Sequence, residues 1–134
     1  MKKFLILGLL FASLSVHSET PAQLLSQYSA EARVAEAGFV ASAKRGDTLF
    51  HQQFGNNADM PGCASCHTNS PLNIGKHTIT GKRIKPLAVA ANTDRFSDSA
   101  KVEKWFGRNC KEVIGRACAA GEKADFIAYM SEVR

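Results

Sequence analysis

The residues with the clearest chemical potential are Cys63 and Cys66, which are separated by two residues and followed directly by His67. In this Cys-x-x-Cys-His pattern, two thiols can form thioether bonds with the two vinyl groups of one porphyrin. The adjacent histidine then lies under the iron as its proximal ligand. The motif therefore predicts one covalently attached haem c, with His67 as a metal ligand.

Two other kinds of site also use closely spaced cysteines. A thiol–disulfide redox pair usually lies in a strand–helix–strand context, whereas this sequence shows helical patterns and no convincing run of alternating strands. A zinc site needs two more ligands at suitable spacing. Cys110 and Cys118 lack the usual close spacing, and His77 has no support as a zinc ligand. The motif therefore favours haem over both alternatives.

The second axial ligand of the iron is less clear. An electron-transfer cytochrome c places methionine opposite the proximal histidine, but beyond residue 18 the chain contains only Met60 and Met130. Met60 lies three residues before Cys63, too close to cross the haem plane easily. Met130 shares a helical face with Phe126, which indicates core packing. A methionine ligand is therefore not expected.

Four possibilities remain for the sixth position: His77, His51, Asn109 or an open site. His77 lies in a polar loop, and His51 lies on a predicted helix, where a surface or hydrogen-bonded histidine is the simpler interpretation. Asn109 falls on one helical face with Val102, Trp105 and Phe106, so its amide is predicted to point where a core residue belongs.

A buried amide costs free energy unless something pairs with it. Iron is one such partner for Asn109. A helix C-cap, a role in which asparagine is common, is the other. Periodicity alone does not decide between the two roles.

Four helices are expected to position these residues. The first starts at Thr20-Pro21-Ala22-Gln23, where Thr20 and Gln23 can form a capping box. The second follows Ser42 and runs to about Gln53, the third is capped by Ser97 or Asp98 and runs to about Cys110, and the last follows Gly121. Residues 55–97 are expected to be loops that wrap the haem. On the second helix, Gly46 predicts the close approach of another helix.

The chain starts with a basic, then apolar segment that predicts export. Lys2 and Lys3 precede an uninterrupted apolar stretch, residues 4–12, and Val16-His17-Ser18 supplies a cleavage site after Ser18. The apolar stretch is much shorter than the roughly 20 residues that span a bilayer, and no later segment is apolar enough. We therefore expect a signal peptide at 1–18, one domain at 19–134, no stable membrane insertion after cleavage, and a periplasmic location.

Removing residues 1–18 leaves 116 residues and lowers the formal charge from +5 to +3. This charge is too small and diffuse to indicate nucleic acid binding, but it suits weak docking to an acidic protein. Lys82, Arg83 and Lys85 form a cluster that could meet such a partner or a haem propionate. A solvated loop is an equally good interpretation.

Export places the remaining cysteines, Cys110 and Cys118, in an oxidising compartment. They enclose seven residues, and a disulfide over so short a loop would contribute about 2–3 kcal/mol by the chain-entropy model. It would also fix the helix end beside Asn109, and rigid support of this kind helps to orient a weak ligand. The alternative is that the disulfide simply stabilises a small exported domain as a whole.

The C-terminal half resembles the sphaeroides haem protein family. The resemblance covers most of the mature chain and is densest from about 80 to 126. Its motifs are Thr80-Gly81-Lys82, Pro86-Leu87-Ala88, Asp94-Arg95-Phe96, Asp98-Ser99-Ala100, Val102-Glu103-Lys104-Trp105, Gly107-Arg108-Asn109-Cys110, Val113-Ile114-Gly115-Arg116, Cys118 and Gly121-Glu122-Lys123-Ala124-Asp125.

This resemblance implies an all-α cytochrome c fold around one covalent haem. It also implies that His67 is the proximal ligand, that Asn109 is the distal ligand in the oxidised state, and that Cys110 and Cys118 form a disulfide. Members of the family bind oxygen and other small diatomic gases when reduced, and they are thought to exchange electrons with a dihaem cytochrome c.

The resulting hypothesis is a redox-gated gas site. The amide oxygen of Asn109, a hard and weak donor, should prefer ferric iron and leave on reduction, so that O₂, CO or NO can bind. Trp105 and Phe106 would line or lie near this pocket. Two alternatives remain: a plain electron carrier with a permanently filled sixth position, and a small oxidoreductase that reduces or detoxifies O₂ or NO. An electron carrier or gas-binding protein is favoured over a dedicated enzyme.

Overall fold

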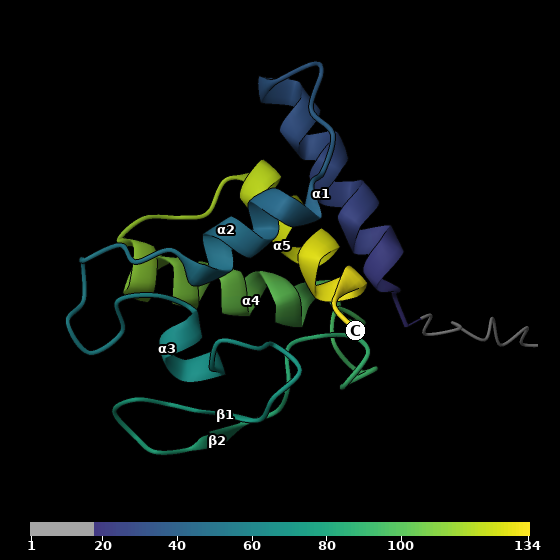
Figure 1. Ribbon diagram of the computed structural model, residues 1–134. Coiled ribbons are helices and arrows are strands. Elements are labelled where there is room, and N and C mark those ends of the chain that lie inside the picture. The colour runs from purple at the N-terminus through teal and green to yellow at the C-terminus, as the bar shows by residue number, and fades with distance from the viewer. Residues whose placement is uncertain (1–17) are drawn as a thin grey trace, which may run out of the picture.

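The computed structural model describes residues 18–134, so the predicted signal peptide lies outside the described residues except for Ser18. Most of the regular structure is helical (Figure 1). The elements, in chain order, are α1 (Pro21–Ala35), α2 (Ala43–His51), α3 (Ala64–His67), β1 (Gly75–Lys76), β2 (Arg83–Ile84), α4 (Ser99–Asn109), the π-helical turn η1 (Cys110–Ile114) and α5 (Ala120–Glu132).

Short polar side chains cap the N-termini of three helices, as the sequence predicts. The Thr20 hydroxyl accepts a hydrogen bond from the backbone N–H of Gln23, and the Gln23 side chain accepts one from the backbone N–H of Thr20 at 2.8 Å. This capping box satisfies N–H groups that a helix start otherwise leaves unpaired. Ser42 caps α2 and Asp98 caps α4 in the same position. The predicted starts of these helices are confirmed.

The two C-terminal helix boundaries differ slightly from the sequence expectation. Helix α4 ends at Asn109, and the chain continues as a π-helical turn rather than as a loop. Helix α5 begins at Ala120, so the expected start after Gly121 is wrong by two residues. The carboxylate of Glu122 accepts a hydrogen bond from the backbone N–H of Ala119 at 2.8 Å, and this bond caps the helix at Ala119, before Gly121.

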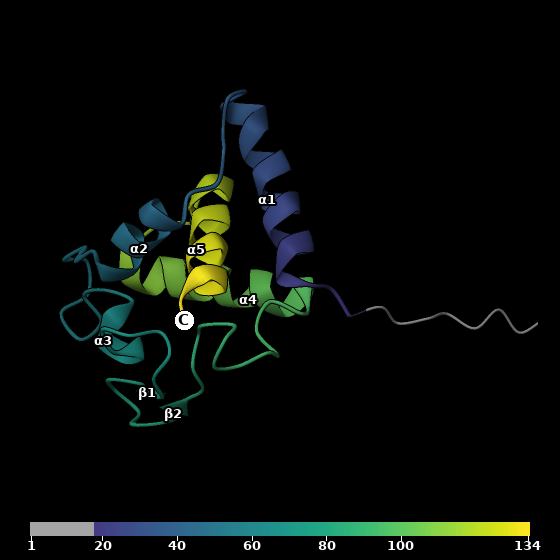
Figure 2. The same cartoon turned by 45° about the vertical axis from the view of Figure 1, so that its right-hand side comes forward.

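Helix α5 is the centre of the helical half of the molecule. It lies between α1 and α2, and α4 crosses beneath it (Figure 2). The largest fully buried side chains come from three of these helices: Leu24 of α1, Phe50 of α2, and Ile127 and Met130 of α5. The burial of Met130 in this core is consistent with its predicted packing role.

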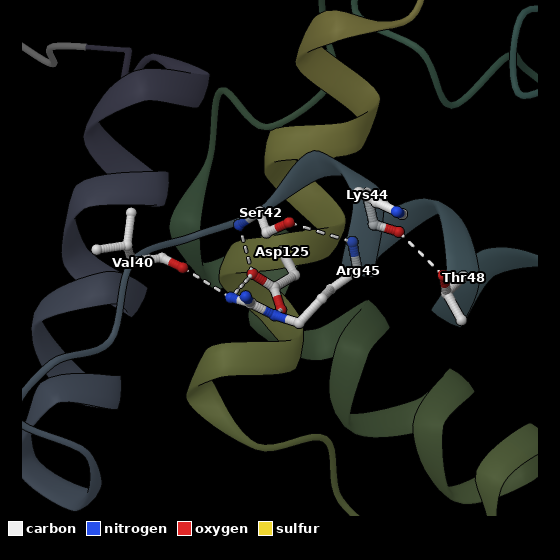
Figure 3. Close-up of polar contacts among 6 residues, drawn as sticks. All are labelled: Val40, Ser42, Lys44, Arg45, Thr48 and Asp125. Atoms are coloured by element: carbon white, nitrogen blue, oxygen red, sulfur yellow. Dashed lines mark hydrogen bonds and ion pairs between the residues drawn. The ribbon is translucent and has the colours of Figure 1, made fainter.

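Helices α2 and α5 cross in direct backbone contact at Gly46, where a Cβ would lie 2.0 Å from the carbonyl oxygen of Asp125. The predicted close approach at Gly46 is therefore confirmed. The buried carboxylate of Asp125 accepts hydrogen bonds from the Ser42 backbone N–H at 2.7 Å and from the Arg45 guanidinium at 2.7 and 2.8 Å (Figure 3). The same guanidinium donates to the carbonyl of Val40.

The segment between α2 and α4 lies on one side of the helices and is mostly irregular, as predicted (Figure 2). It contains the short helix α3 and one antiparallel pair of strands, in which Gly75 pairs with Ile84 and Lys76 with Arg83. Two residues per strand are too few to show an alternating pattern, which is why the sequence does not reveal this hairpin. Within residues 18–134, no helix is long and apolar enough to cross a membrane.

Candidate haem-binding site

The Cys-x-x-Cys-His motif forms one helical turn. Cys63 is the N-cap of α3, Cys66 lies within it, and His67 is its last residue, whose backbone N–H donates to the carbonyl of Cys63 at 3.2 Å. Residues three and four apart on a helix share one face. The turn therefore gathers two cysteines and the histidine on one side, and both cysteines are free thiols.

The motif lies where two apolar clusters meet. Cys63 packs against the main core, whereas Cys66 packs against a second cluster formed by Met60, Cys110, Val113 and Ile114. Burial raises the pKa of the Cys63 thiol to about 11.

His67 is held in its neutral form. Burial, aided by the positive charge of Arg95, lowers the pKa of His67 to about 4. Neutral imidazole is the form that binds metals. The environment of His67 thus suits an axial ligand.

Arg95 is a residue near the site that spacing alone does not single out. Its guanidinium donates to the carbonyl of Lys85 at 2.6 Å and to the carbonyl of Pro86 at 2.8 Å, which holds it in place. Only its charge next to His67 marks it as part of the site. Because Arg95 lies 28 positions away from His67 in the sequence, no local pattern could have predicted that its charge acts on His67.

The backbone is strained directly after His67. Thr68 has φ 64° and ψ 175°, a region that side-chain-bearing residues rarely adopt. The Thr68 hydroxyl donates to the carbonyl of Ser70 at 2.9 Å and accepts from the backbone N–H of Ser70 at 3.2 Å. These bonds fix the backbone conformation of the residues directly after the motif.

The β1–β2 hairpin packs against the motif. A Cβ on Gly75 would lie 2.2 Å from the carbonyl oxygen of Cys66, so only glycine allows this approach. The hydroxyl of Thr78 lies 3.8 Å from the sulfur of Cys66. Residues 75–84 therefore form one wall of the site.

The structure gives both candidate histidines other roles. The Nδ1 atom of His77 accepts hydrogen bonds from the backbone N–H groups of Ile79 and Thr80 at 3.2 and 3.3 Å. Its proton therefore resides on Nε2, and iron could bind Nε2 only if this arrangement were lost. His77 thus organises the hairpin turn.

Both ring nitrogens of His51 face hydrogen-bond acceptors. Nδ1 lies 3.0 Å from the carbonyl and 2.9 Å from the carboxylate of Asp47, and Nε2 lies 3.0 Å from the carbonyl of Asn69. Only protonated histidine donates from both nitrogens. The pKa of His51 is raised, first by the bond to Asn69. The ring therefore links α2 to the segment after the motif.

Asn109 is exposed, which corrects the burial expected from periodicity. Of the residues on its helical face, Val102 is buried, whereas Trp105 is 43% exposed. The C-cap alternative is also wrong: Asn109 has helical angles, φ −69° and ψ −36°, and the left-handed cap residue is Gly115. Among the described contacts, the Asn109 amide makes no hydrogen bond within the protein.

Trp105 and Phe106 take different environments. Lys104 and Arg108 place their charges 6.0 and 5.9 Å from the exposed Trp105 ring. Phe106 is partly buried and makes edge-to-face contacts with Tyr28 and Phe126 at 6.0 and 5.7 Å between ring centroids. Phe106 also packs against the cluster that contacts Cys66. Phe106 therefore connects the core with the site, whereas Trp105 faces outward.

The π turn that follows Asn109 is closed by a disulfide. Cys110 and Cys118 are bonded, with their Cα atoms 5.6 Å apart. Cys110 is buried in the second cluster together with Val113 and Ile114. The backbone next to Asn109 is thus fixed by a covalent bond and by apolar packing.

The residues of this region fit a covalent haem. Two free thiols and a neutral imidazole lie within one helical turn. Of the five exposed large apolar side chains within residues 18–134, Ile74 directly precedes the hairpin, Ile79 lies in it and Trp105 lies in α4. Such surface next to the motif is suited to a large apolar ring.

Comparisons with known proteins point to the same class of protein. The cytochrome c-type protein SHP of Cereibacter sphaeroides is 47% identical over 133 residues, covering 98% of both chains. The chain belongs to the SHP family of c-type cytochromes. Cytochrome c'' of Methylophilus methylotrophus is 40% identical over 128 residues, or 93% of this chain and 89% of that protein. A family described as a domain of unknown function, DUF1924, matches residues 36–130.

Solved structures agree with this family. Oxidized SHP, described as an oxygen-binding cytochrome c, superposes with a TM-score of 0.76 and 48% identity, covering 85% of this chain and 97% of that one. Oxidized cytochrome c'' from M. methylotrophus superposes with a TM-score of 0.77 and 39% identity, covering 85% and 94%. The predicted family, the all-α cytochrome fold and the haem c cofactor are therefore confirmed.

Proposed function

We propose that this SHP-family protein is an exported monohaem cytochrome c that accepts electrons and binds small diatomic gases after Asn109 leaves the ferrous iron. The similarity to SHP, an oxygen-binding cytochrome c, supports the gas-binding part. A solution structure of cytochrome c'', with a TM-score of 0.70 and 40% identity over 82% of this chain and 90% of that one, is described as giving insight into haem-ligand detachment. That description supports a ligand that can leave.

One observation carries the choice of Asn109: the competing side chains are engaged elsewhere. His51 uses both ring nitrogens for carbonyl and carboxylate contacts, and His77 uses Nδ1 to accept two backbone N–H groups of the hairpin turn. Met60 and Met130 are buried in the two apolar clusters. The Asn109 amide makes no described protein hydrogen bond and is attached to a turn that packs next to Cys66.

Each residue has a distinct role in this proposal. Cys63 and Cys66 hold the haem covalently, and His67 binds from the proximal side as a neutral imidazole. When attached, the haem supplies a redox-active iron with one further coordination position. Asn109 would fill that position in the oxidised protein through its amide oxygen, and Trp105 and Phe106 lie on the same helix as Asn109.

The redox gate follows from the chemistry of the amide. A neutral, hard oxygen donor stabilises ferric iron more than ferrous iron, so Asn109 lowers the reduction potential relative to a methionine ligand. Reduction would weaken this bond and would let the Asn109 side chain swing away. The disulfide would keep the adjacent backbone in place while the side chain moves.

Electron delivery involves a docked partner. Residues 60–93 contain four basic residues and no acidic ones, whereas the rest of residues 19–134 contains 11 basic and 12 acidic residues. The net positive charge thus resides in the segment that carries the motif. Lys76, Lys82, Arg83 and Lys85 are all exposed. This charge suits transient docking of an acidic electron donor, for which a dihaem cytochrome c is our candidate.

The location and processing belong to the same proposal. Residues 1–18 act as a cleaved signal peptide, and residues 19–134 form one periplasmic domain. The basic start, the short apolar stretch and the Val16-His17-Ser18 site support export.

The decisive experiment compares the spectra of the oxidised and reduced protein with and without CO. We expect a six-coordinate ferric spectrum, and a reduced spectrum that changes when CO is added. Asn109→Ala should change the ferric spectrum and leave CO binding intact. Lys101→Ala, at an exposed position of the same helix, is the control and should match the wild type in both spectra.

Two results would replace this proposal with another function. A reduced protein that stays low-spin and ignores CO would be a plain electron carrier. Sustained turnover of O₂ or NO with a reduced partner would indicate a small oxidoreductase. An Asn109→Ala ferric spectrum identical to the wild type would remove Asn109 as the ligand.

A further inference from the structure

The loop before the haem motif is tied to the turn after Asn109 by two asparagine side chains. The Nδ2 group of Asn56 donates a hydrogen bond to the carbonyl of Ile114, and the Nδ2 group of Asn57 donates to the carbonyl of Glu112 at 3.4 Å. These pairs lie 58 and 55 positions apart in the sequence. We call this pair of contacts the asparagine clasp.

The clasp joins the loop before the haem motif to the turn that follows Asn109. Residues 55–60 lead directly into Cys63, and the π turn Cys110–Ile114 begins directly after Asn109. Met60 strengthens the junction, since it packs with Cys110, Val113 and Ile114 in the second apolar cluster.

The clasp supports a turn that is weak by itself. A π-helical turn is rare, and such turns occur frequently at functional sites. Carbonyl groups at the end of a helix lack intrahelical partners, and here the asparagine amides supply donors for two of them. The Asn56 side chain also fills the space beside Gly115, where a Cβ would lie 3.1 Å from its Cγ atom.

We propose that Asn56 and Asn57 are positioning residues for Asn109. The clasp fixes the π turn against the loop before the motif. It thereby sets the position of the Asn109 backbone relative to the attached haem, and so how firmly the Asn109 amide holds ferric iron. This inference rests on the proposed role of Asn109 and adds the residues that tune it.

The clasp should act on one redox state only. In the ferric protein, a displaced turn weakens the Asn109–iron bond. In the ferrous protein Asn109 has already left, so CO affinity should not depend on the clasp. A general loss of structure would instead change both states. This asymmetry separates a positioning role from a purely structural one.

The test uses the haem-loaded protein with Asn56→Asp, Asn57→Asp and the double variant. Aspartate keeps the shape of asparagine, but an ionised carboxylate cannot donate to the carbonyl. We expect a ferric spectrum shifted toward high spin, and for the double variant about a tenfold weaker ferric ligation, which for one electron raises the potential by about 59 mV. Ferrous CO affinity should stay within about twofold of the wild type.

Asn92→Asp is the matched control, because Asn92 makes the same kind of bond, from its amide to the carbonyl of Pro86 at 3.2 Å, in a loop with no described hydrogen bond to the π turn. It should keep the wild-type ferric spectrum and potential. Asn56→Gln, which retains a donor, should restore at least part of the ferric spectrum that Asn56→Asp loses.

Three outcomes would overturn the clasp. They are an unchanged ferric spectrum and potential in the double variant, an equal change in ferrous CO affinity, and an equal effect from Asn92→Asp. The ligand itself is tested separately by Asn109→Ala. If that variant alters the ferric spectrum and the clasp variants do not, the clasp is wrong and the proposed function stands. If Asn109→Ala has no effect, the proposed function fails first.

Discussion

The backbone of Asp125 in α5 lies where the side chain of Gly46 in α2 would begin. A Cβ on Gly46 would lie 2.0 Å from the Asp125 carbonyl oxygen and 2.8 Å from the Cβ of Tyr129. The Asp125 side chain closes the same crossing by binding Ser42 and Arg45 (Figure 3). This contact holds α2, which leads into the haem motif, against the central helix.

Gly46→Ala should therefore destabilise the protein strongly. The added methyl group meets backbone atoms that cannot move without separating α2 from α5, and overpacking of this kind costs about 3 kcal/mol or more. Urea unfolding would measure the change. Gly38→Ala is the control, because a Cβ on Gly38 meets no atom within 4 Å, and it should be close to neutral. Equal stability of the two variants would contradict the tight crossing.

Loss of the two motif thiols should release the haem. Cys63→Ser together with Cys66→Ser removes both atoms that can form thioether bonds, so the haem should separate from the chain on a denaturing gel stained for haem. Each single variant should keep one bond and still stain. Ser65→Ala, between the two cysteines, should stain like the wild type. Haem retained by the double variant after denaturation would refute the proposed attachment.

Removal of the disulfide should weaken the fold around the π turn. Cys110→Ala with Cys118→Ala should lower the free energy of unfolding by about 2–3 kcal/mol, because the reduced chain has more freedom when unfolded. Urea titration would show a lower midpoint. A reducing agent should lower the wild-type midpoint and leave that of the variant unchanged. If the reducing agent left the wild-type midpoint unchanged as well, the disulfide would not contribute to stability.

The contacts of the His51 ring with Asp47 and Asn69, here called the His51 bridge, predict that the stability of the protein depends on pH. Its contacts with Asn69 and Asp47 raise the pKa of His51 above the usual value of about 6.5. A raised pKa means that the stabilisation is fully present below the unfolded pKa and is lost as pH rises through the folded pKa. The difference in unfolding free energy between the wild type and His51→Asn should therefore be largest below about pH 6.5 and should shrink as the pH rises further. A difference independent of pH would contradict the protonated bridge.

The basic segment predicts a charge-dependent encounter with the electron donor. Lys82→Gln, Arg83→Gln and Lys85→Gln together should slow association with an acidic dihaem cytochrome and flatten its dependence on ionic strength, since surface charge steers encounter. Stopped-flow electron transfer at several salt concentrations would measure both effects. Arg33→Gln, Lys44→Gln and Lys101→Gln change the same charge on exposed helical positions and should have a smaller effect. Equal effects of the two sets would indicate only a net-charge effect.

Local features were predictable from the sequence because they depend on neighbours a few residues apart. The attachment motif is defined by spacing alone, and the helix starts at Thr20, Ser42 and Asp98 are each set by a side chain that bonds three residues ahead. The resemblance to the sphaeroides haem protein family added the family and the fold, and it agreed with the haem that the motif predicts. The short hairpin escaped prediction because its strands are two residues long.

The roles of the candidate ligands were decided only by the tertiary structure. Periodicity predicted a buried Asn109, but in the structure Val102 is buried and Asn109, on the same predicted helical face, is exposed. His51 meets a carbonyl 18 positions away, and Asn56 meets one 58 positions away. Local spacing carries no information about such contacts, because they exist only once distant segments have packed together.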